Sequence, residues 1–259
     1  MNIGAQLYTV RDFTQTEAGI ASTLQKVREI GYRFVHCSRL GPIDPRRLRD
    51  LLDQNQLQCV VTHTDPERLL TDIEGVIEEH RVIACDSVGL SMMPERYRGS
   101  LEGLRAMIRD YTPSVRAVVD AGLSFHYHNH DIEFIRSGEQ TLLDILLAEM
   151  PDVKLMMCAF WVQVGGGDPI DWIQRYSHRM RHVHLKDMAT RAADVGCGRI
   201  MTPVLSGNMN YRGIIKACAK TKTIENLLVE QDECDGDPFD CLKVSFDNLA
   251  ALFQAMRLS

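Results

Sequence analysis

The chain has 259 residues, of which 45% are hydrophobic and 25% charged, a composition typical of an ordinary globular protein and not of a disordered or fibrous one. Its 29 Lys and Arg residues are outnumbered by 35 Asp and Glu residues, and the net charge of −6 argues against nucleic acid as a partner, because phosphate binding needs clustered basic side chains. No apolar run is long enough to span a membrane and the N-terminus lacks a signal-peptide layout, so we expect a cytoplasmic protein with no membrane partner.

A short apolar segment followed by an amphipathic one recurs along the whole chain. The apolar segments predict strands at Ile3–Thr9, Arg33–Cys37, Gln58–His63, Ser87–Met92, Ser124–His130, Lys154–Phe160, Arg181–Lys186 and Leu227–Gln231. The amphipathic segments predict helices at Glu17–Ile30, Pro45–Gln54, Leu101–Ala121, Leu142–Ala148, Pro169–Tyr176, Asn210–Ala219 and Pro238–Met256. Strands that alternate with helices over about 250 residues are typical of a TIM barrel. The sequence therefore predicts an α/β fold, a single (β/α)8 TIM barrel domain spanning residues 1–259.

The main alternative is a doubly wound α/β fold that binds a dinucleotide. Such folds usually carry a GxGxxG turn after the first strand, but the first predicted strand runs into Tyr8–Arg11, which holds no glycine. The run Gly165–Gly167 follows the sixth predicted strand, where it suits a flexible loop better than a phosphate cradle. Ala189–Ser206 is the longest segment without clear periodicity, and we expect it to form a loop over the active-site face.

Polar side chains gather at the ends of predicted strands five to eight, where the active site of a TIM barrel lies. Residues two apart in a strand share a face, and this spacing defines four sets: His126, His128 and His130; Met156, Cys158 and Phe160; His182, His184 and Lys186; Leu228, Glu230 and Asp232. A single strand histidine is commonly a hydrogen-bonded core group. Several histidines with a carboxylate are harder to explain in that way, because each unsatisfied buried polar group costs about 1–3 kcal/mol. One metal ion would satisfy several of them at once, so we predict a metal site here.

Four segments carry a recognisable combination of motifs: Gln6–Asp12 (QLYTVRD), Tyr127–Asp131 with the following Glu133-Phe134, His184–Asp187, and Val229–Cys234. Together they resemble the sugar phosphate isomerase/epimerase family. This is the xylose isomerase-like TIM barrel group, which also contains inosose dehydratase and tagatose 3-epimerase-type enzymes. The resemblance extends from Ile3 to the last predicted helix.

The resemblance implies one divalent metal ion held by Glu, Asp, His and Glu side chains from strands five to eight. By position, His184 and Glu230 match the last two of these, whereas His128 stands in place of the first Glu and Cys158 in place of the Asp. We therefore expect these four residues as ligands, with a three-ligand site lacking Cys158 as the alternative. A thiolate with imidazoles favours zinc, and the carboxylate-rich sites of relatives favour manganese, so both ions are candidates.

The resemblance also implies an isomerase or epimerase that removes the proton next to the carbonyl of a keto sugar or polyol, through an enediolate. Glu230 is the first candidate base and His128 the second, and Lys186 is a candidate for holding a carboxylate, phosphate or alkoxide of the substrate. Further contacts to the small-molecule substrate are expected from His63, His130, Trp161 and Tyr8.

Two alternative functions stay open. A dehydratase or β-eliminase acting on a keto sugar or keto-inositol needs one base and one acid, which a His/Glu pair supplies. The thiol of Cys158 and the absence of a carboxylate near Ser206 also fit a metal-free barrel that binds a sugar or serves as a non-catalytic subunit. An endonuclease IV-like role is disfavoured by the net charge of −6, and the sequence does not decide whether the chain forms a homo-oligomer.

Overall fold

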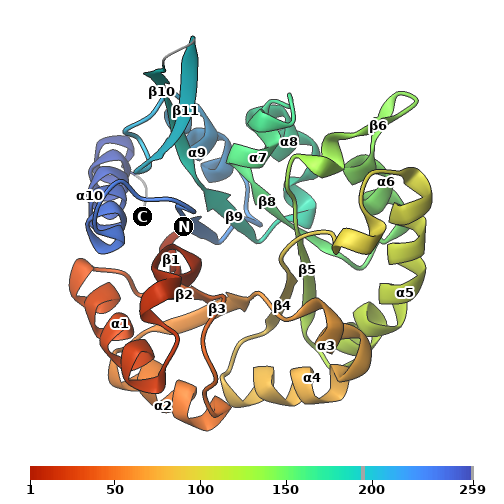
Figure 1. Ribbon diagram of the computed structural model, residues 1–259, viewed down its shortest axis with the longest axis horizontal. Helices are drawn as coiled ribbons and strands as arrows, with labels where there is room; N and C mark the ends of the chain where they lie inside the picture. The colour runs from red at the N-terminus through yellow and green to blue at the C-terminus, as the bar shows by residue number, and fades with distance from the viewer. Residues whose placement is uncertain (194–195, 258–259) are drawn as a thin grey trace.

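The computed structural model describes residues 1–193 and 196–257, and its centre is an eight-stranded parallel sheet that curls into a barrel with the helices outside it (Figure 1). The strands of the barrel are β1 (Asn2–Gln6), β2 (Phe34–Cys37), β3 (Gln58–Thr62), β4 (Ser87–Leu90), β5 (Ser124–His128), β8 (Lys154–Cys158), β9 (His182–Leu185) and β12 (Asn226–Val229). They pair in the order β3-β2-β1-β12-β9-β8-β5-β4. Two short antiparallel hairpins lie outside the barrel, formed by β6 (Arg136–Ser137) with β7 (Gln140–Thr141) and by β10 (Asp187–Ala192) with β11 (Cys197–Thr202). The predicted (β/α)8 barrel is confirmed.

The barrel closes between β3 and β4 because a glycine lets two backbones approach. The backbone N–H of Thr64, just beyond β3, donates to the carbonyl of Gly89 in β4 at 2.9 Å. A Cβ atom at Gly89 would lie 2.1 Å from the carbonyl oxygen of Thr62, well inside van der Waals contact. Any side chain here would therefore push the two end strands apart.

The helices pack around the outside of the sheet. The α-helices of the described chain are α1 (Glu17–Ile30), α2 (Pro45–Gln54), α3 (Pro66–Thr71), α4 (Ile73–Val82), α5 (Leu101–Asp120), α6 (Leu142–Glu149), α7 (Ala159–Val164), α8 (Pro169–Tyr176), α9 (Tyr211–Ala219) and α10 (Pro238–Met256). Short 3-10 helices are η1 (Leu7–Phe13), η2 (Glu95–Tyr97), η3 (Ile132–Phe134) and η4 (Ser177–Arg179). The predicted bounds of α1, α2, α8 and α10 are confirmed, and those of α5, α6 and α9 differ by one residue at one end. Within the described part of the chain, no helix is both long and apolar enough to cross a lipid bilayer.

Four of these helices begin with the same dipeptide, Asp followed by Pro: Asp44-Pro45, Asp65-Pro66, Asp168-Pro169 and Asp237-Pro238. In each case the Asp side chain accepts hydrogen bonds from backbone N–H groups of the first turn, which have no partner inside the helix. Proline suits the first helical position because it lacks the N–H that would be unpaired there. The local sequence thus fixes where these helices start.

The prediction for β8 was too long. Lys154–Phe160 was expected to be one strand, but the strand ends at Cys158 and α7 begins at Ala159. Phe160 therefore belongs to the helix and does not continue the alternating face of Met156 and Cys158. The segment is apolar on both sides of the boundary, and periodicity alone does not separate a buried strand from a buried helix.

Most of the other predicted strands also extend beyond the C-terminal end of the observed strand. The strand predicted at Ile3–Thr9 ends at Gln6, where η1 begins, and the strand predicted at Ser124–His130 ends at His128. His130 consequently lies in the loop after β5 and not in the strand. Helices α3 and α4 between β3 and β4 were not predicted.

The expectation of a loop over Ala189–Ser206 is corrected by the hairpin of β10 and β11. Its two strands pair in antiparallel register from Asp187 opposite Thr202 to Ala192 opposite Cys197. The hairpin projects beyond the rim of the barrel, as Figure 1 shows. Most of its side chains are exposed or half-buried, so it has no apolar face that a sequence pattern could reveal. Residues 194–195 of the predicted loop lie outside the described residues.

Polar and apolar layers alternate inside the barrel. Near the N-terminal ends of the strands, the fully buried rings of His126 and His182 lie 4.7 Å apart between centroids. Above them lies a small buried apolar cluster, separate from the main core, with Val60, Val61, Met156 and Leu228 as its members. A second polar layer follows at the C-terminal ends of the strands. This layer is the candidate functional site.

Candidate metal centre and active site

Five side chains from five different strand ends make up the second polar layer. His36 lies in β2, His63 follows β3, His128 ends β5, His184 lies in β9, and Glu230 directly follows β12. His63, His128 and Glu230 line a cavity of about 790 Å³, and His36 and His184 are fully buried. The layer is at the end of the barrel where TIM-barrel enzymes carry their active sites.

His128, His184 and Glu230 form the first of two groups whose ligating atoms all lie within 4.8 Å of one another. Nδ1 of His184 lies 2.7 Å from Oε2 of Glu230, and because a carboxylate only accepts, the ring nitrogen is the donor. Nδ1 of His128 donates to the carbonyl of Ser91 at 2.9 Å. This leaves Nε2 of His128 as a buried lone pair with no hydrogen-bond partner among the described residues. Such a nitrogen fits a metal ligand, whose other ring nitrogen is usually tied to an acceptor.

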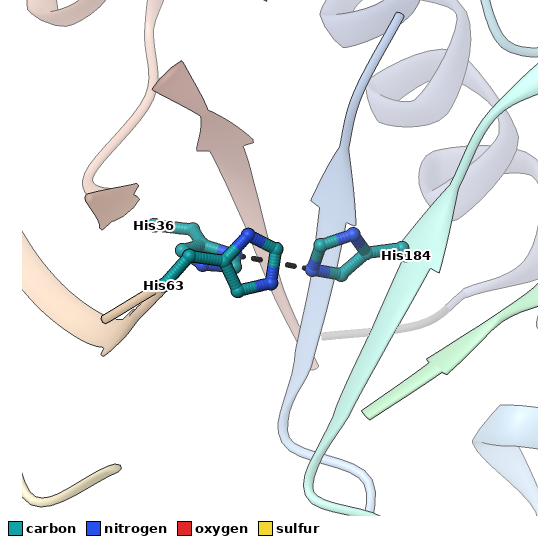
Figure 2. Close-up of side chains that lie close together, drawn as sticks. All are labelled: His36, His63 and His184. Atoms are coloured by element: carbon teal, nitrogen blue, oxygen red, sulfur yellow. Dashed lines mark hydrogen bonds between the residues drawn. The ribbon is translucent and has the colours of Figure 1, made fainter. Parts of the chain in front are cut away.

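His36, His63 and His184 form the second group, again with ligating atoms within 4.8 Å of one another. Figure 2 shows the rings of His36 and His63 facing His184, with Nδ1 of His36 3.0 Å from Nε2 of His184. Nδ1 of His63 is paired with the hydroxyl of Ser38 at 3.1 Å. The buried Nε2 atoms of His36 and His63 find no hydrogen-bond partner in the part of the chain that the structure describes.

Burial keeps three imidazoles of this layer neutral, those of His36, His63 and His128. It lowers the pKa of His36, His63 and His128 well below the ordinary value, and neighbouring histidines lower it further. The pKa of His130 is lowered to about 3, chiefly by burial and then by Lys186. Only an unprotonated imidazole binds a metal, so these rings have the required form at neutral pH.

Glu230 is held as a carboxylate by the groups around it. Burial alone would raise its pKa, but the charge of Lys186 and the contact with His184 lower it more, so the net shift is downward. Nζ of Lys186 lies 3.1 Å from Oε2 of Glu230 and 2.8 Å from Oδ1 of Asp232. Nε2 of Gln6 donates to Oε1 of Glu230 at 3.1 Å. The site therefore contains a fixed negative charge together with the neutral imidazoles of His36, His63 and His128.

Cys158 lies next to this site but joins neither of the two groups that the described residues form. It is fully buried, and burial raises the pKa of its thiol to about 12. The thiolate is the form that binds a metal, and here it is strongly disfavoured. The role of Cys158 as a ligand stays a prediction.

The residues expected to contact substrate lie around the same cavity. Tyr8, His63 and His130 line it, and Lys186 is part of its wall. Trp161, in α7, lies beside His130 with ring centroids 5.0 Å apart. Nε1 of Trp161 and Nδ1 of His130 are buried, and neither has a hydrogen-bond partner within the described residues. A substrate hydroxyl that reached them would supply the missing partner.

The sequence analysis missed His36 and Gln6. His36 stands near the end of a predicted strand, the position that drew attention to His128 and His184, so the same rule would have found it. It was overlooked because no second polar residue follows it at alternate spacing within its strand. Gln6 was not named as a site residue, because its segment served only as evidence of the family resemblance and the role of this side chain was not considered.

Comparisons with known proteins agree with this fold. A model of the xylose isomerase-like TIM barrel family matches residues 24–237. The structure resembles a sugar phosphate isomerase/epimerase from Parabacteroides distasonis with a TM-score of 0.78, at 19% identity over 96% of this chain and 98% of the other. It resembles an L-ribulose 3-epimerase with a TM-score of 0.76, at 12% identity over 99% and 95% of the two chains. A probable 3-DHS dehydratase from Bacillus anthracis gives a TM-score of 0.74, at 15% identity over 96% and 99%. At such identities the likeness shows the fold, and no curated protein matches the sequence.

Proposed function

The chain belongs to the xylose isomerase-like TIM barrel family, and we propose that it is an enzyme that isomerises or epimerises a keto sugar or polyol by removing the proton next to the carbonyl. The observation that carries the proposal is that the ionised Glu230 lies near Nε2 of His128 at the edge of one cavity, and that this Nε2 has no hydrogen-bond partner among the described residues. A carboxylate and a neutral imidazole are the usual general bases for this chemistry. The structural likeness to sugar phosphate isomerase/epimerases and an L-ribulose 3-epimerase supports the same reaction class.

The proposal includes one divalent metal ion, zinc or manganese, as cofactor. His128, His184 and Glu230 would hold it, because their ligating atoms lie within 4.8 Å of one another and Nε2 of His128 is unpaired among the described residues. Two imidazoles with one carboxylate suit zinc well, and the carboxylate also accommodates manganese. When bound, the ion supplies Lewis-acid stabilisation of the negative charge that develops on the carbonyl oxygen. The thiol of Cys158 could join only as a thiolate.

The proton would be taken by Glu230 or by His128. Lys186 keeps Glu230 ionised, but the lowered pKa also makes this carboxylate a weak base. Burial lowers the pKa of His128 as well, and its single lone pair at Nε2 binds either a cation or a proton at one time. An epimerase that works on both faces of the carbon needs a base on each side, and these two residues are the pair that the cavity offers.

The other polar groups of the cavity would orient the substrate. Lys186 presents its ammonium between Glu230 and Asp232 and would hold an alkoxide, a carboxylate or a phosphate. His130, Trp161 and Tyr8 would contact sugar hydroxyls, and the indole face would cover apolar C–H groups of the ring. His63 would complete this wall or bind a cation with His36.

A dehydratase is the second candidate. The observation that favours it is the likeness to a probable 3-DHS dehydratase at a TM-score of 0.74. After the same proton abstraction, a β-eliminase needs an acid that protonates the departing oxygen, and one of the two bases would take that role. The two candidates share the first step and differ in the product.

Proton abstraction is tested by incubating the protein, loaded with zinc or with manganese, with a panel of keto sugars and keto-inositols in D₂O. We expect deuterium to enter the carbon next to the carbonyl, and we expect this exchange to be lost in Glu230→Gln. An exposed histidine, His178, supplies the matched control His178→Ala, which should exchange like the wild type. A product lighter by one water would identify the dehydratase. Sugar binding without exchange for any compound would indicate a barrel that only binds sugar.

A further inference from the structure

The barrel is incompletely closed at the seam between β3 and β4. These strands stand at the two ends of the sheet order, and in the described chain an isolated bridge between Thr64 and Leu90 joins them. Figure 1 shows the two strands side by side. Nearer their N-terminal ends, a cavity of about 210 Å³ opens at the seam, lined by Cys59 of β3 and by Cys85, which lies two residues before β4. Two thiols therefore line the same gap from opposite sides.

Cys59 and Cys85 lie at about the same level of this seam. Each precedes its residue of the bridge, Thr64 or Leu90, by five positions. Parallel strands rise by about 3.3 Å per residue, so equal offsets from a bridge keep two residues side by side, to within the one-residue bulge that β3 makes against β2. The two thiols are hydrogen-bond partners of each other. Neighbouring strands lie about 4.8 Å apart, and a disulfide needs Cα atoms about 4.4–6.8 Å apart, so the two cysteines are placed to be bridged.

A third thiol, that of Cys37 in β2, contacts Cys59 from the other side. The backbone of β2 pairs Cys37 with Thr62, three residues beyond Cys59. Because the bulge takes up one of these residues, the Cα atoms of Cys37 and Cys59 are separated by one strand spacing and two residue rises, or roughly 8 Å. Cysteines whose Cα atoms are more than about 7 Å apart cannot be bridged without backbone movement. Cys37 is therefore a neighbour of the pair and not a partner in a disulfide.

We propose that Cys59 and Cys85 form a modification site at which hydrogen peroxide oxidises the two thiols to a disulfide that closes the seam. In the first step, Sγ of Cys59 attacks one peroxide oxygen, the O–O bond breaks, and a sulfenic acid and water form. In the second step, Sγ of Cys85 attacks the sulfenic sulfur, the S–S bond forms, and the hydroxyl group leaves with the thiol proton as water. The pair of thiols loses two electrons, and the peroxide takes them up.

The surroundings favour Cys59 as the thiol that reacts first. Hydrogen bonds from the thiols of Cys37 and Cys85 hold the pKa of Cys59 well below its ordinary value, although burial opposes this shift. The pairing with Cys59 and burial raise the pKa of Cys85. The thiolate is the form that attacks an oxidant. Hydrogen peroxide is little larger than water, which takes up about 30 Å³ in the liquid, so the cavity of about 210 Å³ admits it.

The disulfide would tie the start of β3 to the start of β4 and enclose α3 and α4 in a covalent loop. Such a link restricts the unfolded chain, so the oxidised protein should unfold at a higher temperature than the reduced protein. The pair lies toward the N-terminal ends of the strands, whereas the candidate active site lies at their C-terminal ends. The inference therefore does not rest on the proposed function.

The test exposes reduced protein to hydrogen peroxide, alkylates the remaining thiols and maps the peptides by mass spectrometry. The exposed thiol of Cys197 reports within the same sample that oxidation has taken place. We expect a peptide pair joined through Cys59 and Cys85 that dithiothreitol separates again. Cys37→Ser keeps a hydrogen-bond donor beside Cys59 and serves as the matched control, which should give the same peptide pair. In Cys85→Ser the second step is blocked, so a sulfenic acid should accumulate at Cys59 and be trapped by dimedone.

The wild-type protein alone can overturn the proposal, so the test does not depend on the folding of any variant. A disulfide that joins Cys59 to Cys37 would overturn it. Cys59 and Cys85 that both remain open to alkylation after unfolding, in a sample whose Cys197 is fully oxidised, would overturn it as well. We also expect the thermal midpoint of the oxidised wild type to rise by several degrees and to return on reduction. An equal or lower midpoint would show that the disulfide distorts the seam instead of closing it.

Discussion

Acidification should destabilise the protein in part through His126, a histidine buried in the lower polar layer of the barrel. Its side chain is fully buried, and its only hydrogen bond within the described residues joins Nε2 to the hydroxyl of Ser124 at 2.9 Å. Burial, followed by the charge of Arg181, lowers the pKa of His126 to about 3. The ring of His126 therefore stays neutral in the folded protein between pH 5.5 and pH 7.5.

The size and sign of the effect follow from proton linkage. An unfolded histidine has a pKa of about 6.5, so between that value and the folded pKa the unfolded chain binds a proton that the folded chain does not. The free energy of unfolding consequently falls as the pH falls through this window. From pH 7.5 to pH 5.5, one such histidine lowers it by about 1.4 kcal/mol.

Urea unfolding at both pH values, for the wild type and for His126→Phe, isolates this contribution. The substitution has its own cost in stability, but that cost is the same at the two pH values and cancels in the difference. We expect the variant to lose about 1.4 kcal/mol less than the wild type on acidification. The neighbouring buried residue Phe125 supplies a non-titrating control, Phe125→Leu, which should keep the wild-type pH dependence. If His126→Phe loses as much stability as the wild type, the ring is charged or hydrated in the folded state and the reasoning is refuted.

Three further predictions concern the site and the helices. Glu230→Gln removes the carboxylate that the proposed chemistry needs, and the initial rate of deuterium exchange should fall by about 10²–10⁴-fold; a rate within a few fold of the wild type would contradict its role. Gly165→Ala would place a Cβ atom 2.4 Å from Cγ of Phe134. We expect the free energy of unfolding in urea to fall by about 1–3 kcal/mol. An unchanged value would show that the loop relaxes freely. Thr141→Ala removes the hydroxyl that accepts a hydrogen bond from the backbone N–H of Asp144 at the start of α6. The urea midpoint of unfolding should fall by an amount equivalent to about 1 kcal/mol. An unchanged midpoint would mean that water replaces the lost hydrogen bond.

The barrel could be predicted from the sequence because each strand and helix must bury its own apolar face. Helix starts were predictable where a local signal marks them, as Asp168-Pro169 marks α8. The start of α7 was not predictable, since Cys158 and Phe160 continue the apolar run of β8 and only the turn of the backbone ends the strand. The hairpin of β10 and β11 has no buried face, so it left no periodic pattern.

The site could be predicted only in part, because its contacts join residues far apart in the sequence. The spacing within strands and the family resemblance led to His128, His184 and Glu230, and the structure brings these three together. His36 was missed because no second polar residue shares its face within β2, and its contact with His184, 148 residues away, becomes visible only in the fold. The state of the Cys158 thiol also depends on burial by the whole fold and not on its neighbours in the chain.

The central claim, that this barrel holds a divalent metal ion, is tested most directly by elemental analysis of wild-type protein and His184→Ala purified without chelator. His184 belongs to both groups of candidate ligands, so its removal takes a ligand from each of them. We expect about one equivalent of zinc, manganese or a similar ion in the wild type and almost none in a folded His184→Ala protein. Wild-type protein that holds no stoichiometric metal even after soaking, or a variant that keeps the full amount, would contradict the account.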